Sequence, residues 1–165
     1  MILLEETGMH LGTDGKLDIT TLCYVEKDGK YLMLHRVKKK HDINKDKYIG
    51  IGGHVEDRES PLECIKREAL EEAGLTLLNP RLRGIITFLI DDIYELTFLY
   101  TCTDFEGEPG ECNEGILEWI DKAKVKDLPI WEGDILMFDL LNTRDDVFSL
   151  KLTYENDVLT NAAAD

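Results

Sequence analysis

The fold is inferred first from residues 52–75, which read GGHVEDRESPLECIKREALEEAGL. The second half of this segment carries the start and stop signals of a helix. Ser60 suits the N-cap, Pro61 suits the first helical position, and Glu63 completes an S-x-x-E capping box. Gly74 stands where a residue in the left-handed conformation ends a helix. The segment therefore predicts a short helix after a double-glycine turn.

Three glutamates of this helix are expected to share one side. At about 100° per residue, Glu68, Glu71 and Glu72 fall within about 100° of one another. Like charges at this spacing destabilise an isolated helix, so the cluster needs an explanation. One explanation is a solvated acidic face in a chain with 34 acidic residues. The other is a metal site, because Arg67 can orient a carboxylate and oxygen ligands on a rigid element suit Mg²⁺ or Mn²⁺.

The spacing within this segment resembles the Nudix box, G-x5-E-x7-R-E-U-x-E-E-x-G-U. The first U position holds Ala69, a small apolar residue. The resemblance implies an α/β fold, namely a Nudix-type α/β/α sandwich with a mixed β-sheet, and hydrolysis of a diphosphate linked to another moiety. The remaining fixed positions are matched by Gly53, Glu59, Arg67, Glu68, Glu71, Glu72, Gly74 and Leu75.

By the same resemblance, the box binds Mg²⁺, with Mn²⁺ as an alternative. Glu59 and Arg67 would support the box, and Gly53 and Gly74 would shape its turns. Metal ions that bridge phosphate oxygens neutralise developing charge and activate a water for in-line attack on phosphorus. The metal ligands implied are Glu68, Glu71, Glu72 and the backbone carbonyl of Gly52.

Composition sets limits on the class of protein. The 165 residues fit one domain, expected over residues 1–165 with a core at about 18–159 and a disordered tail at 160–165. A net charge of −15 argues against stable binding to nucleic acid or to an anionic membrane surface. A phosphate-bearing substrate would then need local cations. A small-molecule nucleotide is therefore the expected partner, with the chain a monomer or a homodimer.

The cysteines and the start of the chain indicate a cytoplasmic protein. The first ten residues, MILLEETGMH, lack a basic region and an apolar stretch of signal-peptide length. No stretch is apolar for the roughly 20 residues of a spanning helix. The four cysteines form no CxxC pair or zinc spacing and are expected to be small buried residues.

The remaining segments predict strands around two helices that cover both faces of the sheet. Residues 104–115 are expected to be a loop, and residues 133–141 have helical spacing. The apolar side of the box helix is expected to comprise Leu62, Ile65, Ala69 and Ala73. The expected strands are residues 19–26, 31–35, 83–90, 94–103, 116–120, 148–154 and 158–159.

Similarity over most of residues 20–148 extends to the MutT-like subgroup, which removes oxidised purine nucleoside triphosphates. Arg36, Lys38 and Lys39 lie in the densest basic stretch of the chain. The similarity makes Arg36 a triphosphate contact, with the two lysines as further candidates. The alternative is a solvated basic loop.

Three further positions align with functional residues of mammalian MutT homologues. Glu114 would bind metal or act as general base, although a loop glutamate in so acidic a stretch is often simply solvated. Trp131 would stack on the base and Asp134 would read its edge, unless Trp131 is a core residue beside a helix. Ile49 and Gly133 depart from the asparagine and aspartate of those homologues, which puts 8-oxo-guanine preference in doubt.

Three hypotheses follow for the function. The first is hydrolysis of a nucleoside triphosphate, of the 8-oxo-dGTP type, to the monophosphate and pyrophosphate. The second keeps this chemistry on a nucleotide sugar, a dinucleoside polyphosphate or a dinucleotide. The third is a Nudix-shaped binding module without turnover, which the complete set of box carboxylates disfavours.

Overall fold

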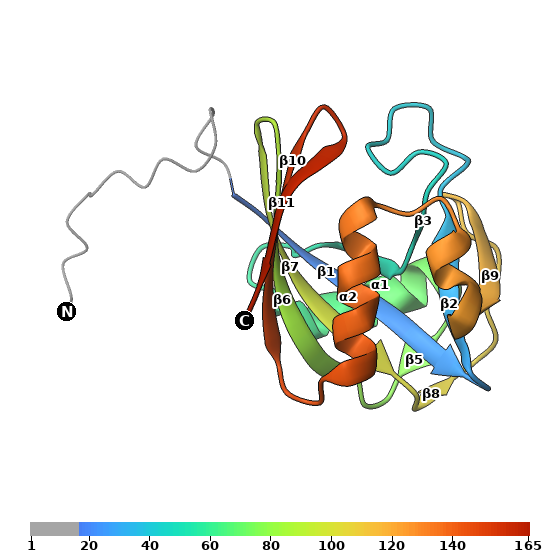
Figure 1. The fold of residues 1–165 in the computed structure, drawn as a ribbon. Helices are drawn as coiled ribbons and strands as arrows, with labels where there is room; N and C mark the ends of the chain where they lie inside the picture. The colour runs from blue at the N-terminus through green and yellow to red at the C-terminus, as the bar shows by residue number, and fades with distance from the viewer. Residues whose placement is uncertain (1–16) are drawn as a thin grey trace, which may run out of the picture.

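The computed structural model describes residues 17–165 (Figure 1). The prediction that the chain starts without a signal sequence concerns residues outside this range. In chain order the elements are β1 (Leu17–Lys27), β2 (Lys30–His35), β3 (Tyr48–Ile49), β4 (Ile51–His54), α1 (Pro61–Ala73), β5 (Thr76–Leu77), β6 (Arg81–Ile90), β7 (Ile93–Cys102), β8 (Phe105–Glu106), β9 (Ile116–Asp121), the 3-10 helix η1 (Lys122–Asp127), α2 (Glu132–Thr143), β10 (Phe148–Glu155) and β11 (Val158–Ala164).

Within the described residues, nine strands form one mixed sheet in the order β11-β10-β6-β7-β1-β2-β3, with β4 added to β1 and β9 added to β2. β1 runs parallel to β7, and β10 runs parallel to β6. The other neighbours in this sheet are antiparallel. β1 therefore lies at the centre, where it joins the box segment to the rest of the sheet. This arrangement confirms the predicted mixed sheet.

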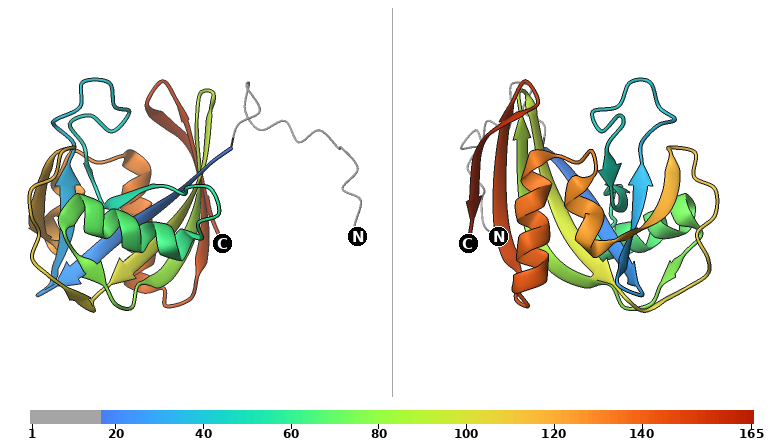
Figure 2. Two further views of the ribbon diagram at one scale, coloured as in Figure 1. Left: turned by 180° about the vertical axis from the view of Figure 1, so that it is seen from behind. Right: turned by 45° about the vertical axis from the view of Figure 1, so that its right-hand side comes forward.

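The helices α1 and α2 cover opposite faces of the sheet, as the views from front and back show (Figures 1 and 2). Each face of the sheet carries its own hydrophobic core. Successive side chains of β1 belong to different cores, because strand residues alternate between the two faces. Tyr24 belongs to the core under α2, whereas Cys23 and Val25 belong to the core under α1. The helices thus cover both faces, as the sequence predicts.

The signals at both ends of the box helix are confirmed. The backbone N–H of Glu63 donates to Ser60 Oγ at 3.2 Å, and the backbone N–H of Ser60 donates to Glu63 Oε2 at 2.8 Å. Gly74 ends the helix with φ 70°, in the left-handed region that favours glycine. These caps fix where α1 begins and ends beside the double-glycine turn.

The predicted apolar side of α1 is wrong at one position. Leu62 is 43% exposed, whereas Ile65, Ala69 and Ala73 are buried as predicted. Cys64 is buried in its place and lies 3.2 Å from Thr21 Oγ1. The small thiol allows α1 to lie close to β1 and β4, where a leucine has no room.

The C-terminal tail, expected to be disordered at residues 160–165, is ordered. Residues 158–164 form β11, which pairs antiparallel with β10. Asp165 and Ser149 extend the pairing with reciprocal backbone hydrogen bonds of 3.0 and 3.1 Å. Most of the β11 side chains are exposed. Backbone pairing orders this strand, so composition gave no signal of it.

Five elements were not predicted, namely the short strands β3, β4, β5 and β8 and the 3-10 helix η1. The loop expected at residues 104–115 contains the short strand β8, which pairs with β5. η1 precedes α2, and α2 extends beyond the predicted residues 133–141 at both ends. The four cysteines are free and buried, as expected. Within residues 17–165, none of the helices combines the length and apolar character needed to cross a bilayer.

Candidate active site

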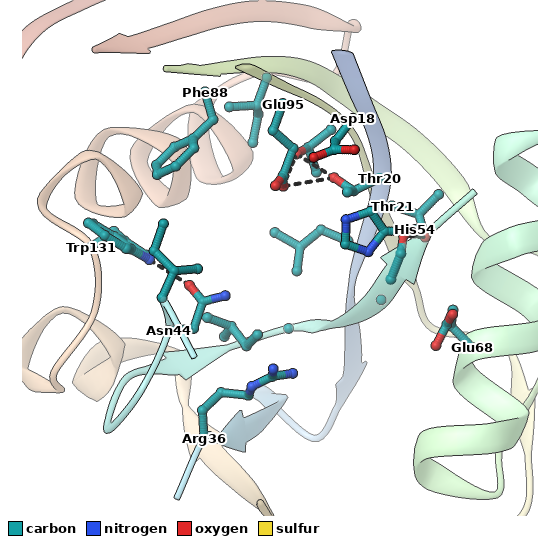
Figure 3. Close-up of a pocket in the computed structure, with 18 of the residues that line it drawn as sticks. Asp18, Thr20, Thr21, Arg36, Asn44, His54, Glu68, Phe88, Glu95 and Trp131 are labelled. Atoms are coloured by element: carbon teal, nitrogen blue, oxygen red, sulfur yellow. Dashed lines mark hydrogen bonds between the residues drawn. The ribbon is translucent and has the colours of Figure 1, made fainter. Parts of the chain in front are cut away.

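A cavity of about 600 Å³ lies between β1, β4, α1, α2 and the loop from residue 36 to residue 47 (Figure 3). Glu68 and Glu72 of α1 line one end, and Trp131 and Asp134 line another. Residues of the central strand β1, among them Thr21 and Tyr24, also line the cavity. The cavity therefore joins the box segment to the residues that were predicted to bind a base.

Glu72 faces the double-glycine turn. The backbone N–H of Gly52 donates to Glu72 Oε2 at 3.3 Å. A Cβ on Gly52 would lie 1.9 Å from the carbonyl oxygen of Thr21, so this close approach to β1 requires glycine. Burial, followed by the nearby Glu114 carboxylate, raises the pKa of Glu72 to about 8. A cation at this position would counter both effects and favour the ionised carboxylate.

Glu68 occupies the space left by the second glycine of the turn. A Cβ on Gly53 would lie 2.5 Å from Glu68 Oε1. Burial raises the pKa of Glu68, while hydrogen bonding from Arg67 opposes this rise. The hydrogen bond runs from Arg67 Nη1 to Glu68 Oε1 at 2.7 Å. Gly53 and Arg67 together fix the direction in which this carboxylate points.

Arg67 forms a two-pronged ion pair with Glu59. Its Nε donates to Glu59 Oε1 at 2.7 Å and its Nη2 donates to Glu59 Oε2 at 3.0 Å. These bonds lower the pKa of Glu59 to about 2 and raise the pKa of Arg67. Arg67 Nη2 also donates to the carbonyl oxygen of His54 at 3.2 Å, which ties α1 to the end of β4. This geometry suits the predicted supporting role of the pair.

The three box glutamates do not share one environment. Glu68 and Glu72 line the cavity, whereas the Glu71 side chain is 60% exposed and accepts a hydrogen bond from Arg67 Nη1 at 3.2 Å. Within the described residues, no three His, Cys, Asp or Glu side chains form a ready-made metal cluster. The convergence of Glu68, Glu71 and Glu72 on metal therefore stays a prediction.

The chemistry of the cavity nevertheless suits a divalent cation. Glu68 and Glu72 are buried enough for their pKa values to rise, and the Glu114 carboxylate raises the pKa of both. Carboxylate oxygens beside a cavity that leaves room for water are the donors that Mg²⁺ prefers. The residues that would hold it are Glu68, Glu72, Glu114 and the carbonyl of Gly52, with Glu71 at the margin.

The predicted phosphate contacts surround Glu114. Arg36 Nη1 and Lys39 Nζ both contact the Glu114 carboxylate, and Arg36 Nε donates to Asp42 Oδ2 at 2.6 Å. Arg36 and Lys39 line the cavity. Lys38 lies outside the lining and donates to the carbonyl oxygen of Cys112 at 2.6 Å. Arg36 and Lys39 are thus placed near the acidic end, and Lys38 anchors a loop.

The predicted base contacts lie at the other end. Trp131 is 6% exposed, and its ring meets Phe88 and Tyr154 edge to face, with centroids 5.4 and 5.0 Å away. Lys47 Nζ lies 4.3 Å from the centroid of the Trp131 ring. Burial raises the pKa of Asp134 to about 7. An aromatic wall beside a carboxyl group that can donate or accept a hydrogen bond suits a heterocyclic base.

The cavity also contains residues that the sequence did not single out. Asn44 binds Trp131, and Phe88 lines the same end (Figure 3). Glu95 accepts hydrogen bonds from Thr20 at 2.9 Å and from Thr97 at 3.2 Å. The parallel pairing of β1 with β7 could have revealed this cluster, but that pairing is not readable from local sequence. Asn44 lies in an irregular loop that gave no periodic signal.

Comparison with known proteins agrees with the fold and the box. The family model described as NUDIX domain matches residues 16–141. The Bacillus subtilis protein "Uncharacterized Nudix hydrolase YvcI" is 30% identical over 131 residues, which cover 76% of this chain and 79% of that protein. The Danio rerio "Oxidized purine nucleoside triphosphate hydrolase" is 33% identical over 125 residues, which cover 74% of this chain and 78% of that protein.

A solved structure of a MutT protein has the same fold as this chain. The MutT protein of Bacillus halodurans superposes with a TM-score of 0.80 at 30% identity, covering 90% of this chain and 97% of that one. The chain therefore belongs to the NUDIX domain family and is a Nudix hydrolase. Within that family its resemblance is to the MutT group, as the sequence indicated. Nudix hydrolases generally use divalent metal ions.

Proposed function

We propose that this protein hydrolyses a nucleoside triphosphate to the monophosphate and pyrophosphate in a Mg²⁺-dependent reaction. The proposed substrate class is the oxidised purine nucleotides, of the 8-oxo-dGTP type. The protein would then clear the nucleotide pool in the cytoplasm and so protect DNA from damaged precursors. The observation that carries this proposal is one cavity whose lining includes both the box carboxylates Glu68 and Glu72 and the pair Trp131 and Asp134.

Residues at one end of the cavity would bind the metal and the phosphates, and residues at the other end would bind the base. Bound Mg²⁺ would supply charge neutralisation and a water of lowered pKa. Glu114 lies beside Glu72 and would either complete the metal ligands or accept the proton of the attacking water. Arg36 and Lys39, now paired with Glu114, would turn to phosphate oxygens, and Lys38 would add charge at the rim.

At the base end, Trp131 would pack against the purine and Asp134 would bind its edge. With a pKa of about 7, Asp134 is partly protonated at neutral pH and can serve as a donor or as an acceptor. Ile49 also lines this end, and Gly133 is buried against Leu152 and Tyr154. Neither residue offers a polar side chain, so the preference among purines has to be measured.

A panel of nucleotides assayed side by side with Mg²⁺ tests this proposal. The panel contains 8-oxo-dGTP, dGTP, dATP, a nucleotide sugar, a dinucleoside polyphosphate and a dinucleotide, with pyrophosphate and orthophosphate measured separately. Pyrophosphate release from the triphosphates, abolished by Glu72→Gln and Glu71→Gln but kept by Glu155→Gln, is the expected result. Glu155 is an exposed residue of β10, so its variant controls for the loss of one charge.

The same panel separates the alternatives. Turnover of the nucleotide sugar, the dinucleoside polyphosphate or the dinucleotide in place of the triphosphates would assign the second hypothesis. Tight nucleotide binding without hydrolysis under any divalent ion would assign a binding module. Pyrophosphate release retained by both glutamine variants would refute the roles given to the box. We further propose that residues 1–165 form a single domain that acts as a monomer or a homodimer.

A further inference from the structure

Asn44 is held against the pocket tryptophan with its amide in one orientation. Trp131 Nε1 donates to Asn44 Oδ1 at 2.7 Å. An indole N–H can only donate, so the amide oxygen must face Trp131 and the amide NH₂ must point away from it. Figure 3 shows the nitrogen of Asn44 turned toward the interior of the cavity. Two N–H donors are therefore presented beside the proposed base pocket.

The loop that carries Asn44 is fastened at several points. The backbone N–H of Asn44 donates to Asp42 Oδ1 at 3.0 Å, and the other Asp42 oxygen accepts from Arg36 Nε at 2.6 Å. Lys47 Nζ lies over the Trp131 ring. The backbone N–H of Arg36 donates to the carbonyl oxygen of Lys47 at 2.9 Å, which closes the loop on itself. Asn44 is thus positioned before a ligand arrives, so little ordering cost remains on binding.

Asn44 differs from the other polar residues at this end of the cavity. Among residues 17–165, it is the one side-chain amide in the cavity lining. Asp134 can act as donor or acceptor, whereas the pinned amide can only donate toward the interior. A free asparagine pairs well with adenine, because its oxygen accepts from N6 while its nitrogen donates to N7. With its oxygen turned to Trp131, Asn44 loses that option.

We propose that Asn44 is a specificity-determining residue that selects 6-oxopurines over 6-aminopurines. This inference rests on the proposed function, because it assumes that a purine lies beside Trp131. The Asn44 N–H groups donate to the 6-oxo oxygen and to a neighbouring acceptor, whereas the 6-amino group of an adenine would bring a donor against a donor. An unpaired buried donor lowers affinity by roughly 10- to 100-fold, which sets the size of the expected preference.

Equilibrium binding of dGMP and dAMP to the full chain tests this residue separately from turnover. The two ligands share sugar and phosphate, so the ratio of their dissociation constants reports on the base alone. The wild type should prefer dGMP by roughly 10- to 100-fold. Asn44→Asp keeps an oxygen for Trp131 but replaces the donors with an acceptor, so it should shift the ratio toward dAMP. Asn44→Ala should weaken dGMP but not dAMP, because it removes both the donor to the 6-oxo oxygen and the donor that opposes the 6-amino group.

The control is Asn161→Asp, which makes the same chemical change on the exposed strand β11 and should leave the ratio as in the wild type. Each ratio is measured within one variant, so a partly unfolded sample does not distort it. An unchanged ratio in Asn44→Asp, or a wild type without preference for dGMP, overturns the inference. If the wild type shows the ratio but releases no pyrophosphate from dGTP or 8-oxo-dGTP, the proposed function fails and the role of Asn44 stands.

Discussion

Replacing Gly53 with alanine should strongly reduce activity while leaving the fold intact. Gly53 lies outside the left-handed region, so its backbone accepts alanine. The new Cβ would lie 2.5 Å from Glu68 Oε1 and 2.6 Å from Glu68 Cδ, which are the far end of a flexible side chain. Glu68 would swing away at a cost of about 0.5–1.5 kcal/mol. Alanine recovers about 0.4–1 kcal/mol by restricting the unfolded chain, so the net change in stability is small.

Gly52→Ala is the matched control, because its clash is with backbone. The Cβ at Gly52 would lie 1.9 Å from the Thr21 carbonyl oxygen, and β1 cannot yield there without losing its pairing with β4. A loss of roughly 1–3 kcal/mol or more in unfolding free energy is expected. In Gly53→Ala the displaced carboxylate should lower kcat/KM by about 100-fold. Urea unfolding and pyrophosphate release measure the two effects, and an unchanged kcat/KM in Gly53→Ala would refute the reasoning about Glu68.

Three further predictions concern Asp134, Arg67 and β11. The raised pKa of Asp134, about 7 against an ordinary 3.8, means that this carboxyl stays protonated in the folded chain while it ionises in the unfolded chain. As pH rises between those two values, the free energy of unfolding of the wild type should therefore fall by up to about 4 kcal/mol relative to that of Asp134→Asn. Parallel pH profiles of unfolding free energy for the two proteins would contradict this. Arg67→Lys removes the two-pronged bond to Glu59 and should lower kcat/KM by roughly 10-fold or more in the pyrophosphate assay, whereas full activity would mean that Arg67 only fills space. Hydrogen exchange should show protected amides within Val158–Ala164, because this strand pairs with β10, and exchange at the rate of an unfolded peptide would restore the prediction of a disordered tail.

The box helix was predictable because its signals are local. Ser60, Glu63 and Gly74 fix its ends through contacts within a few residues, and fixed spacing identifies the family. The mixed sheet was predictable as a class, because strands precede, separate and follow the helices. Its order was not, since the pairing of β1 with β7 and of β10 with β6 joins segments far apart in the chain.

The site was less predictable than the helix that carries it. Helical spacing placed Glu68, Glu71 and Glu72 together, but Arg67 draws Glu71 outward while Glu72 turns toward Gly52. That difference depends on how α1 packs against β4, which helical spacing does not describe, and on the Glu114 loop, which lies far from α1 in sequence. No local sequence pattern indicated Asn44, because its position depends on a hydrogen bond from Trp131, which is distant in the chain.

The central claim is that the carboxylates beside the double-glycine turn hold the divalent cation that admits a nucleotide. Titration with Mn²⁺ followed by electron paramagnetic resonance, with a non-hydrolysable nucleoside triphosphate analogue present, tests this claim directly. The account predicts bound Mn²⁺ in the wild type and in Glu155→Gln, and a large loss of binding in Glu72→Gln. Equal Mn²⁺ binding by Glu72→Gln and the wild type would contradict it.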